Sequence, residues 1–230
     1  MSGVETSTEH PSDEVAVHQG VIINCYFRGQ IKRVVMEEMK DHIDMYEGIQ
    51  PPHLAFYGQA IRFNLESAIS SIQFLVQCLD ATNTAEDPDS LTDPILDSIQ
   101  NILIHTACLS KYFWPINKGI NKIHKKRAQN LRKSFNIRSD SAIRNKDLRN
   151  HLEHLDENLD KYLWSKPIVG NVYPAYVGPE MRRDEVPYHF FRAFFTDTAT
   201  FESLGLRLDI QPIIDELYEI YRGASDSKNI

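Results

Sequence analysis

The stretch that decides the fold is Leu148-Arg149-Asn150-His151-Leu152-Glu153-His154-Leu155-Asp156-Glu157-Asn158-Leu159. Its leucines, continued by Leu163, recur at steps of four, three, four and four, which is the spacing of one face of an α-helix. No Gly or Pro lies between Ser141 and Ser165, and most residues there favour a helix. The pattern predicts one helix whose leucine stripe faces a core, capped at its start by Asp140 or Ser141.

The face opposite the leucines is polar and carries histidine. At about 100° per residue, Asn150 lies opposite the stripe, flanked by His154 and Glu157. Arg149 and His151 lie on the two shoulders of this polar face. We therefore expect Arg149 and His154 to point away from the core, where both side chains are available for binding or chemistry.

A positive block runs directly into this predicted helix. Residues 118–149 hold eleven Lys or Arg and two acidic residues, a net charge of +9 in a chain whose total is −7, so the rest carries −16. A basic stretch in an acidic protein indicates a surface for a polyanion. The alternative is a basic helix whose charged face is simply solvated.

Composition indicates a soluble globular protein. The chain has 230 residues, of which 42% are hydrophobic and 25% charged, enough for one domain with or without an appendage. We find no apolar run of membrane-spanning length and expect no membrane partner. The polar, acidic start is unlike a secretory signal, and three widely spaced cysteines show neither disulfide nor zinc spacing. A reducing, cytoplasmic setting is therefore predicted.

Hydrophobic periodicity divides the first part of the chain into a tail and several helices. Residues 1–18 are predicted to be a disordered tail, and residues 21–27 fit either a strand or the start of a helix. Four helices are predicted before the leucine stripe, at residues 30–46, 53–80, 91–113 and 118–135.

The amino-acid composition changes after Trp164. Residues 166–183 are rich in Pro and Gly and are predicted to form a loop that includes at most a short strand. Aromatic segments at 188–196 and 199–204 predict a hairpin, extended by 206–209, and residues 211–221 predict a last helix.

The expected fold is mainly α. We predict a bundle of four to five helices with a small C-terminal antiparallel β element and a final helix. The expected organisation is a tail (1–18), a helical bundle (19–165), and a C-terminal loop, β-hairpin and helix packed on that bundle (166–230).

Arg149-Asn150-His151-Leu152-Glu153-His154 resembles the Arg-polar-x-x-x-His motif of the HEPN superfamily, the higher eukaryotes and prokaryotes nucleotide-binding domains. The resemblance covers about residues 30–165 and rests on the motif and on its place in a late helix of a bundle. It implies a metal-independent endoribonuclease that acts as a homodimer, with two motif helices facing one composite cleft. It assigns the catalytic site to Arg149, His154 and Asn150, the last in the polar position that supports the other two.

The resemblance also implies partners. These are RNA, a second copy of the chain and, because many relatives are toxins or defence effectors, an antitoxin protein. No metal and no cofactor are expected, since RNA carries its own nucleophile in the 2′-hydroxyl. Histidine can move protons near neutral pH, and arginine presents a fixed positive fork to phosphate.

Supporting and binding roles follow from spacing and charge. His151 is expected to pair with Asp147 and to support the site. The basic block supplies candidate RNA contacts, which are Lys122, Lys125, Lys126, Arg127, Arg132 and Lys133.

Each assignment has a simpler alternative. His154 could be an ordinary surface histidine, and Arg149 could form a salt bridge with Glu153 at i+4. His151, His154 and Asp147 could instead form part of a metal site, but a Glu-x-x-His motif repeated on two helices is absent. The aromatic residues Phe190, Phe191, Phe194 and Phe195 are expected in the core rather than in a base-stacking platform. The competing function is a non-catalytic helical dimer that binds a partner protein or nucleic acid.

Overall fold

The computed structural model describes residues 51–115, 121–165, 167–181 and 186–226. All described residues belong to one compact unit of the chain. The predicted tail, the ambiguous segment 21–27 and the predicted helix 30–46 lie outside the described residues.

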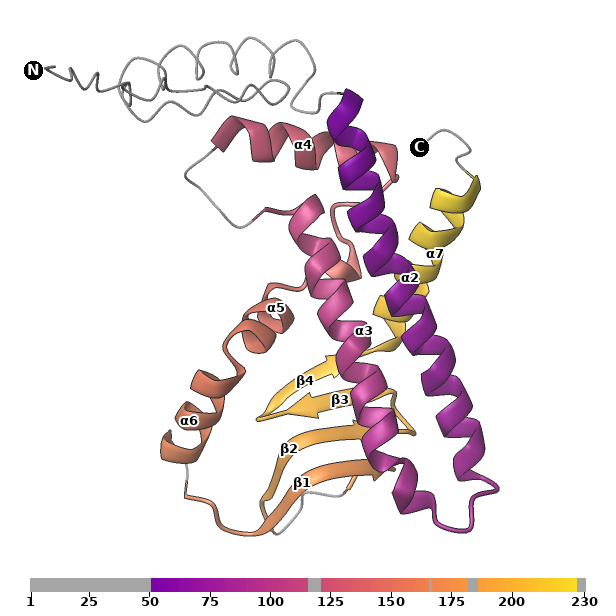
Figure 1. The fold of residues 1–230 in the computed structure, drawn as a ribbon. Helices are drawn as coiled ribbons and strands as arrows, with labels where there is room; N and C mark the ends of the chain where they lie inside the picture. The colour runs from indigo at the N-terminus through magenta and orange to yellow at the C-terminus, as the bar shows by residue number, and fades with distance from the viewer. Residues whose placement is uncertain (1–50, 116–120, 166, 182–185, 227–230) are drawn as a thin grey trace, which may run out of the picture. The chain divides into compact units, whose positions relative to one another are not determined.

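Two long helices form the centre of the fold. Helix α2 (Pro51–Thr82) and helix α3 (Thr92–Phe113) run side by side and are joined through the short 3-10 helix η1 (Pro88–Leu91) (Figure 1). Their apolar stripes meet, and Ile61, Leu65 and Leu103 are almost fully buried between them. Both predicted helices are therefore confirmed, because a long uninterrupted apolar periodicity is the strongest local signal for a helix.

The segment that carries the motif is not one continuous helix. After α4 (Asn121–Ser134) come η2 (Ala142–Arg144), α5 (Lys146–Glu153) and α6 (Leu155–Ser165). The break is at His154, whose φ of −128° and ψ of 39° are not helical. The prediction of a single helix was wrong at this point.

The break follows from where the two pieces pack. Leu148 on α5 is 2% exposed, whereas Leu163 on α6 is 50% exposed, so the predicted stripe is buried only at its start. Helix α5 packs on α3, and α6 turns to the sheet, where the Tyr162 hydroxyl lies 2.8 Å from Nδ1 of His189. Packing against two different partners overrides the helical propensity of the joining residues.

The cap of α5 is also displaced from its predicted position. Asn145, rather than Asp140 or Ser141, is the N-cap, since its side-chain oxygen accepts a hydrogen bond from the backbone N–H of Leu148 at 2.9 Å. Ser141 instead donates its hydroxyl to the buried carboxylate of Glu216, which also accepts the Ala142 N–H at 2.5 Å. Glu216 thereby ties the start of η2 to the last helix.

The C-terminal part forms a four-stranded sheet in the order β1-β2-β3-β4. Its strands are β1 (Asn171–Gly178), β2 (Tyr188–Phe195), β3 (Thr200–Ser203) and β4 (Leu206–Asp209). The predicted hairpin of β2 and β3 is confirmed, as is its extension by β4, and both pairs are antiparallel. Strand β1, however, pairs parallel with β2, so the sheet is mixed rather than antiparallel. Parallel neighbours usually need a longer connection than residues 179–187, which is why the sequence did not suggest this pairing.

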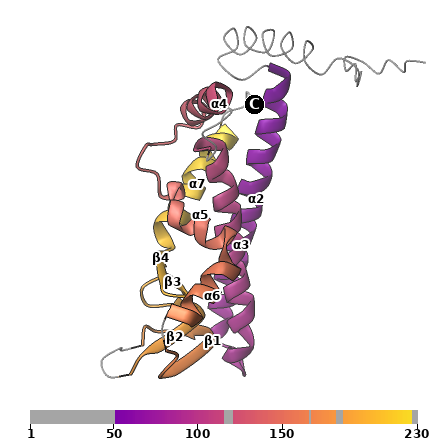
Figure 2. The same cartoon turned by 90° about the vertical axis from the view of Figure 1, so that its left-hand side faces the viewer.

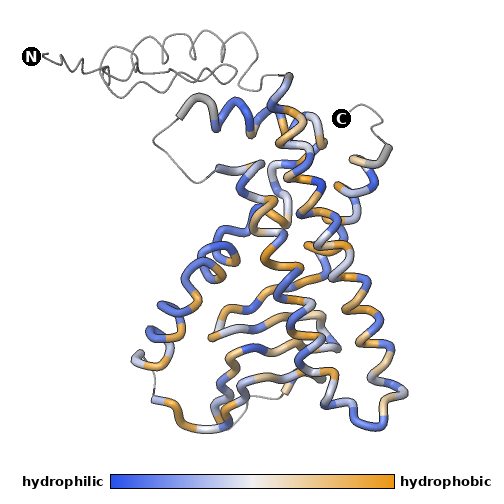
Figure 3. Tube along the Cα trace, in the orientation of Figure 1, coloured by the Kyte–Doolittle hydropathy of each residue, from blue (hydrophilic) through white to orange (hydrophobic). Residues whose placement is uncertain are grey.

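The sheet and the last helix share one core with the bundle. Helix α7 (Gln211–Asp226) buries Ile213, Leu217 and Ile220 in the same cluster as the apolar faces of α2 and α3. Phe194 is buried in this core, and Phe190 and Phe195 are buried in a second, smaller cluster with Ala193, as predicted for core aromatics, whereas Phe191 is half-buried. In contrast, α4 and α5 carry mostly hydrophilic residues (Figure 3).

Candidate active site

Helices α4 and α5 approach the C-terminal end of α3 (Figures 1 and 2). Several basic side chains gather there. They line a pocket of about 500 Å³, which we call the arginine pocket. Its positively charged lining residues are Lys125, Arg132, Arg144, Lys146 and Arg149. Its other lining residues include Trp114, Gln129 and Asn150, and no Asp or Glu is among the described residues that line it.

Carbonyls at the C-terminal end of α3 accept hydrogen bonds from three arginines, of which Arg132 and Arg149 line the pocket. Arg127 Nη2 donates to the Lys111 carbonyl and Arg149 Nη1 to the Trp114 carbonyl, each at 3.4 Å. Arg132 Nη1 donates to the Phe113 carbonyl. The last carbonyls of a helix have no partner within the helix, and the helix dipole makes this end negative, so cations are favoured there.

Arg149 is buried rather than exposed. The residue is 7% exposed, and within the described part of the chain its Nε has no hydrogen-bond partner. The expectation that it points away from the core was therefore wrong, because α5 presses against α3 along this edge. The predicted alternative, a salt bridge with Glu153, is also wrong, since Glu153 pairs with Lys111.

Trp114 has two of the guanidinium groups close to its rings. The Cζ atoms of Arg132 and Arg144 each lie 5.9 Å from the centre of the Trp114 rings, so they are at most twice that distance apart. Burial, and then the positive charge of Arg144, lower the pKa of Arg132. The pocket thus holds cations close enough to repel one another.

His154 lines a second, shallower hollow beside the first, which we call the histidine hollow. Its volume is about 440 Å³. The His154 side chain is 55% exposed, and its Nδ1 lies 3.5 Å from the Glu157 carboxylate. The hollow is lined by Asp147, Asn150, His151, His154, Glu157, Asn158, Lys161 and Leu206.

Asn150 is the residue that the two hollows share. It is exposed and lines both the arginine pocket and the histidine hollow. A ligand that spans Asn150 can therefore contact Arg149 on one side and His154 on the other. The three motif residues thus line two adjoining hollows, with Arg149 in the arginine pocket, His154 in the histidine hollow and Asn150 in both.

His151 does not form the predicted pair with Asp147. Its Nε2 lies 3.0 Å from the hydroxyl of Ser203 on β3, and its carbonyl accepts a hydrogen bond of 3.5 Å from Asn158. The ring is buried, and burial lowers the pKa of His151 below its ordinary value of 6.5. Among the described residues no group of three or more His, Cys, Asp or Glu is placed to hold a metal ion.

The predicted RNA-binding cations are divided between pocket, surface and interior. Lys125 and Arg132 line the arginine pocket, Lys133 is exposed, and Lys126 is half-buried. Arg127 turns inward and places its Cζ 5.4 Å from the centre of the Tyr57 ring, so it is not a free surface cation. The side chain of Lys122 is outside the described part.

Sequence reasoning missed three members of the arginine pocket, which are Trp114, Arg144 and Lys146. Arg144 and Lys146 were counted in the basic block but given no role, because only the fold brings them to the end of α3. Trp114 is the residue after α3, and an aromatic residue at a helix end carries no recognisable binding signal.

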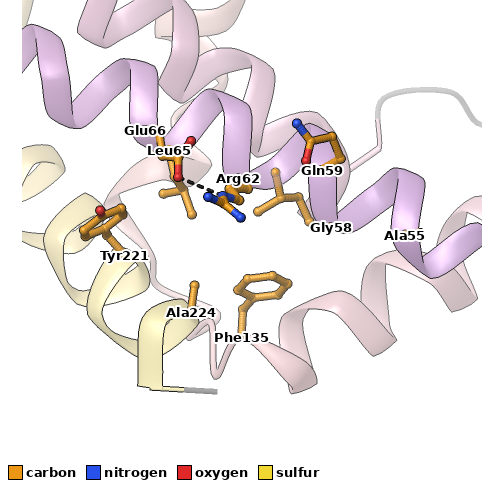
Figure 4. A pocket seen from close by; sticks show the side chains of 10 residues that line it. Ala55, Gly58, Gln59, Arg62, Leu65, Glu66, Phe135, Tyr221 and Ala224 are labelled. Atoms are coloured by element: carbon orange, nitrogen blue, oxygen red, sulfur yellow. Dashed lines mark hydrogen bonds and ion pairs between the residues drawn. The ribbon is translucent and has the colours of Figure 1, made fainter. Parts of the chain in front are cut away.

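A further cavity, of about 560 Å³, lies between α2, α7 and Phe135 (Figure 4). Its lining includes Tyr221 and the Arg62–Glu66 ion pair, which has an N–O distance of 2.8 Å. It shares no lining residue with the arginine pocket or the histidine hollow. Its only ionisable side chains among the described residues are Arg62, Glu66 and Tyr221, and the first two neutralise one another, so it offers less chemistry than the motif surface.

Comparison of the chain with protein family models, with curated proteins and with solved structures found no match. None of the helices in the described residues is long and apolar enough to span a membrane.

Proposed function

We propose that this chain is a metal-independent endoribonuclease of the HEPN type, which acts as a homodimer in the cytoplasm. The observation that carries the proposal is the position of Asn150 between the arginine pocket and the histidine hollow. A strand of RNA laid across Asn150 meets a buried guanidinium on one side and an exposed imidazole on the other. These two groups would supply the phosphate-binding cation and one of the proton-transfer groups of metal-free phosphodiester cleavage.

The reaction uses the RNA's own 2′-hydroxyl as nucleophile. The 2′-oxygen forms a bond to phosphorus while a base takes its proton, and the bond from phosphorus to the 5′-oxygen breaks as that oxygen receives a proton from an acid. Arg149 stabilises the charge on the phosphoryl oxygens. His154 moves protons, and a second His154 across a two-fold axis supplies the other proton-transfer group. The products are a 2′,3′-cyclic phosphate and a 5′-hydroxyl.

The test is incubation of the purified chain with a mixed RNA pool. His154→Ala should reduce cleavage by about 10²-fold or more. Its matched control is His53→Ala, which removes another exposed histidine and should cleave as the wild type does. Cleavage that survives His154→Ala, or products without a cyclic phosphate, would contradict the mechanism. Light scattering should give the mass of two chains, and a monomer that cleaves at full rate would rule out the composite site.

A second candidate is a module that binds RNA or a partner protein without cleavage. It is favoured by the hydrogen bond from Arg149 to the Trp114 carbonyl, which gives this guanidinium a structural task as well. This function predicts retention of RNA with no cleavage under any condition. The proposed role as a toxin or defence effector held by an antitoxin predicts that expression arrests growth, and that His154→Ala relieves the arrest.

A further inference from the structure

The positive charge of the arginine pocket exceeds the negative charge of the side chains that line it. Five cationic side chains line it, and within the described residues none of the five forms an ion pair with a carboxylate. The carbonyls at the C-terminal end of α3, which Arg132 and Arg149 contact, belong to the negative end of a helix dipole that is equivalent to about half an elementary charge. This partial negative charge helps to position the arginines, but it is too small to neutralise five positive side chains. This excess of positive charge is local to the pocket, since the chain as a whole has a net charge of −7.

The buried floor of the pocket reinforces this conclusion. Arg149 is more than nine-tenths buried, and its Nε has no partner among the described residues. A buried charged donor without a partner is costly, and negative charge brought into the pocket by a ligand would offset that cost. The structure therefore retains at Arg149 a donor that it does not itself satisfy.

The chemistry of the lining selects a compact polyanion. A single phosphodiester or a carboxylate brings one negative charge, and a phosphate monoester brings about 1.5 to 2 with three acceptor oxygens. Cations arranged around one hollow of about 500 Å³ are better matched by several charges on adjacent groups than by charges spread along an extended chain. Guanidinium groups in particular bind phosphate oxygens through paired hydrogen bonds.

We infer that the arginine pocket binds an oligophosphate group of two or three linked phosphates, carried by a free nucleoside triphosphate or by the 5′-triphosphate end of an RNA. Arg149 and Arg132 form the floor, and Lys125, Arg144 and Lys146 close around the outer phosphates. The inference deepens the proposed function and rests on it in placing a phosphate against Arg149. It adds that the ligand is recognised by linked phosphates rather than by one backbone phosphodiester.

The test measures binding, so it does not depend on cleavage. Titration calorimetry is performed with inorganic tripolyphosphate, with ATP, and with one short RNA carrying either a 5′-triphosphate or a 5′-hydroxyl. The 5′-triphosphate RNA should bind at least tenfold more tightly than the 5′-hydroxyl RNA. Binding of tripolyphosphate and ATP as tight as that of the triphosphate RNA assigns the free compound as ligand, and tighter binding of the RNA assigns the RNA end. Equal affinity for the two RNA ends overturns the inference.

Variants locate the binding in the pocket. The double variant Arg144→Gln, Lys146→Gln removes two exposed cations and should raise the Kd for tripolyphosphate at least tenfold. Arg138→Gln, an exposed arginine of the same connector that does not line the pocket, should leave the Kd unchanged. Equal effects of the double variant and the control overturn the inference.

His154→Ala separates the two proposals. It should keep tripolyphosphate affinity while reducing RNA cleavage by about 10²-fold or more. A chain that binds tripolyphosphate but never cuts RNA retains the inference and loses the proposed function. A chain that cuts RNA through His154 but does not discriminate between the two 5′ ends loses only the inference.

Discussion

The imidazole Nε2 of His151 lies 3.0 Å from the Ser203 hydroxyl, and both residues are buried. This contact joins α5, which carries the motif, to strand β3 of the sheet. The histidine that was expected to support catalysis from the surface instead fastens the motif helix to the C-terminal part of the fold. The orientation of Arg149 and Asn150 therefore depends on a residue more than fifty positions away in sequence.

The buried His151 makes the fold sensitive to acid. Burial lowers the pKa of both His151 and His105 in the folded chain, so below pH 6.5 the unfolded state binds more protons than the folded state. The free energy of unfolding should therefore fall as pH drops below 6.5, and should level off above it. Thermal unfolding scans between pH 5 and 8 test this. His151→Gln should flatten the slope, and an unchanged slope in that variant would show that other groups govern the acid response.

Replacement of Arg149 by methionine should separate binding from stability. The hydrogen bond to Trp114 is long at 3.4 Å and hence weak, whereas the guanidinium is buried among other cations. Desolvation and repulsion outweigh that bond, so Arg149→Met should leave the free energy of unfolding unchanged or raise it by about 1 kcal/mol. Urea unfolding measures this, and RNA cleavage should be lost. A fall of several kcal/mol would identify Arg149 as mainly structural.

Glu216 is predicted to be essential for the position of η2. Glu216→Ala leaves the Ser141 hydroxyl and the Ala142 N–H without their acceptor in a buried setting, which should lower the free energy of unfolding by about 3 kcal/mol. Glu219→Ala, an exposed neighbour on α7, should change it by less than about 0.5 kcal/mol. Because η2 leads directly to Arg144 and Lys146, Glu216→Ala should also weaken tripolyphosphate binding. Equal stability of the two variants would refute this role.

Removal of metal ions should not affect cleavage. The proposed chemistry takes its positive charge from Arg149 and its proton transfer from His154, so a chelator such as EDTA should leave the rate unchanged. The measurement is the initial rate of RNA cleavage before and after dialysis against EDTA. Loss of activity that is restored by added Mg²⁺ or Zn²⁺ would contradict the arginine and histidine mechanism.

The elements that sequence predicted well are those whose signal is local and long. The apolar stripes of α2 and α3 extend over many turns, and the aromatic segments of β2 and β3 flank an evident turn. The pattern at 148–163 was equally regular, but its helix broke because Leu148 and Leu163 meet different neighbours. Periodicity shows that a segment has an apolar side, not that the whole side faces one partner.

Residue type and spacing lead to the candidate residues but not to their geometry. The motif and the basic block predict Arg149, His154, Lys125 and Arg132 as site residues. The burial of Arg149 depends on the Trp114 carbonyl at the end of α3, 35 residues earlier in the chain. Contacts of that range are fixed by tertiary packing, which leaves no periodic trace in the sequence.

The shared core has a practical consequence for dissecting this protein. The change in composition after Trp164 suggests a cut near Ser165, yet Ile213, Leu217 and Ile220 of α7 fill the same interior as α2 and α3. A fragment that stops there would expose the apolar faces of α2 and α3 to water. It would also lose the contact between His151 and Ser203 that holds the motif helix. Truncation experiments on the part that carries the motif should therefore keep everything through α7.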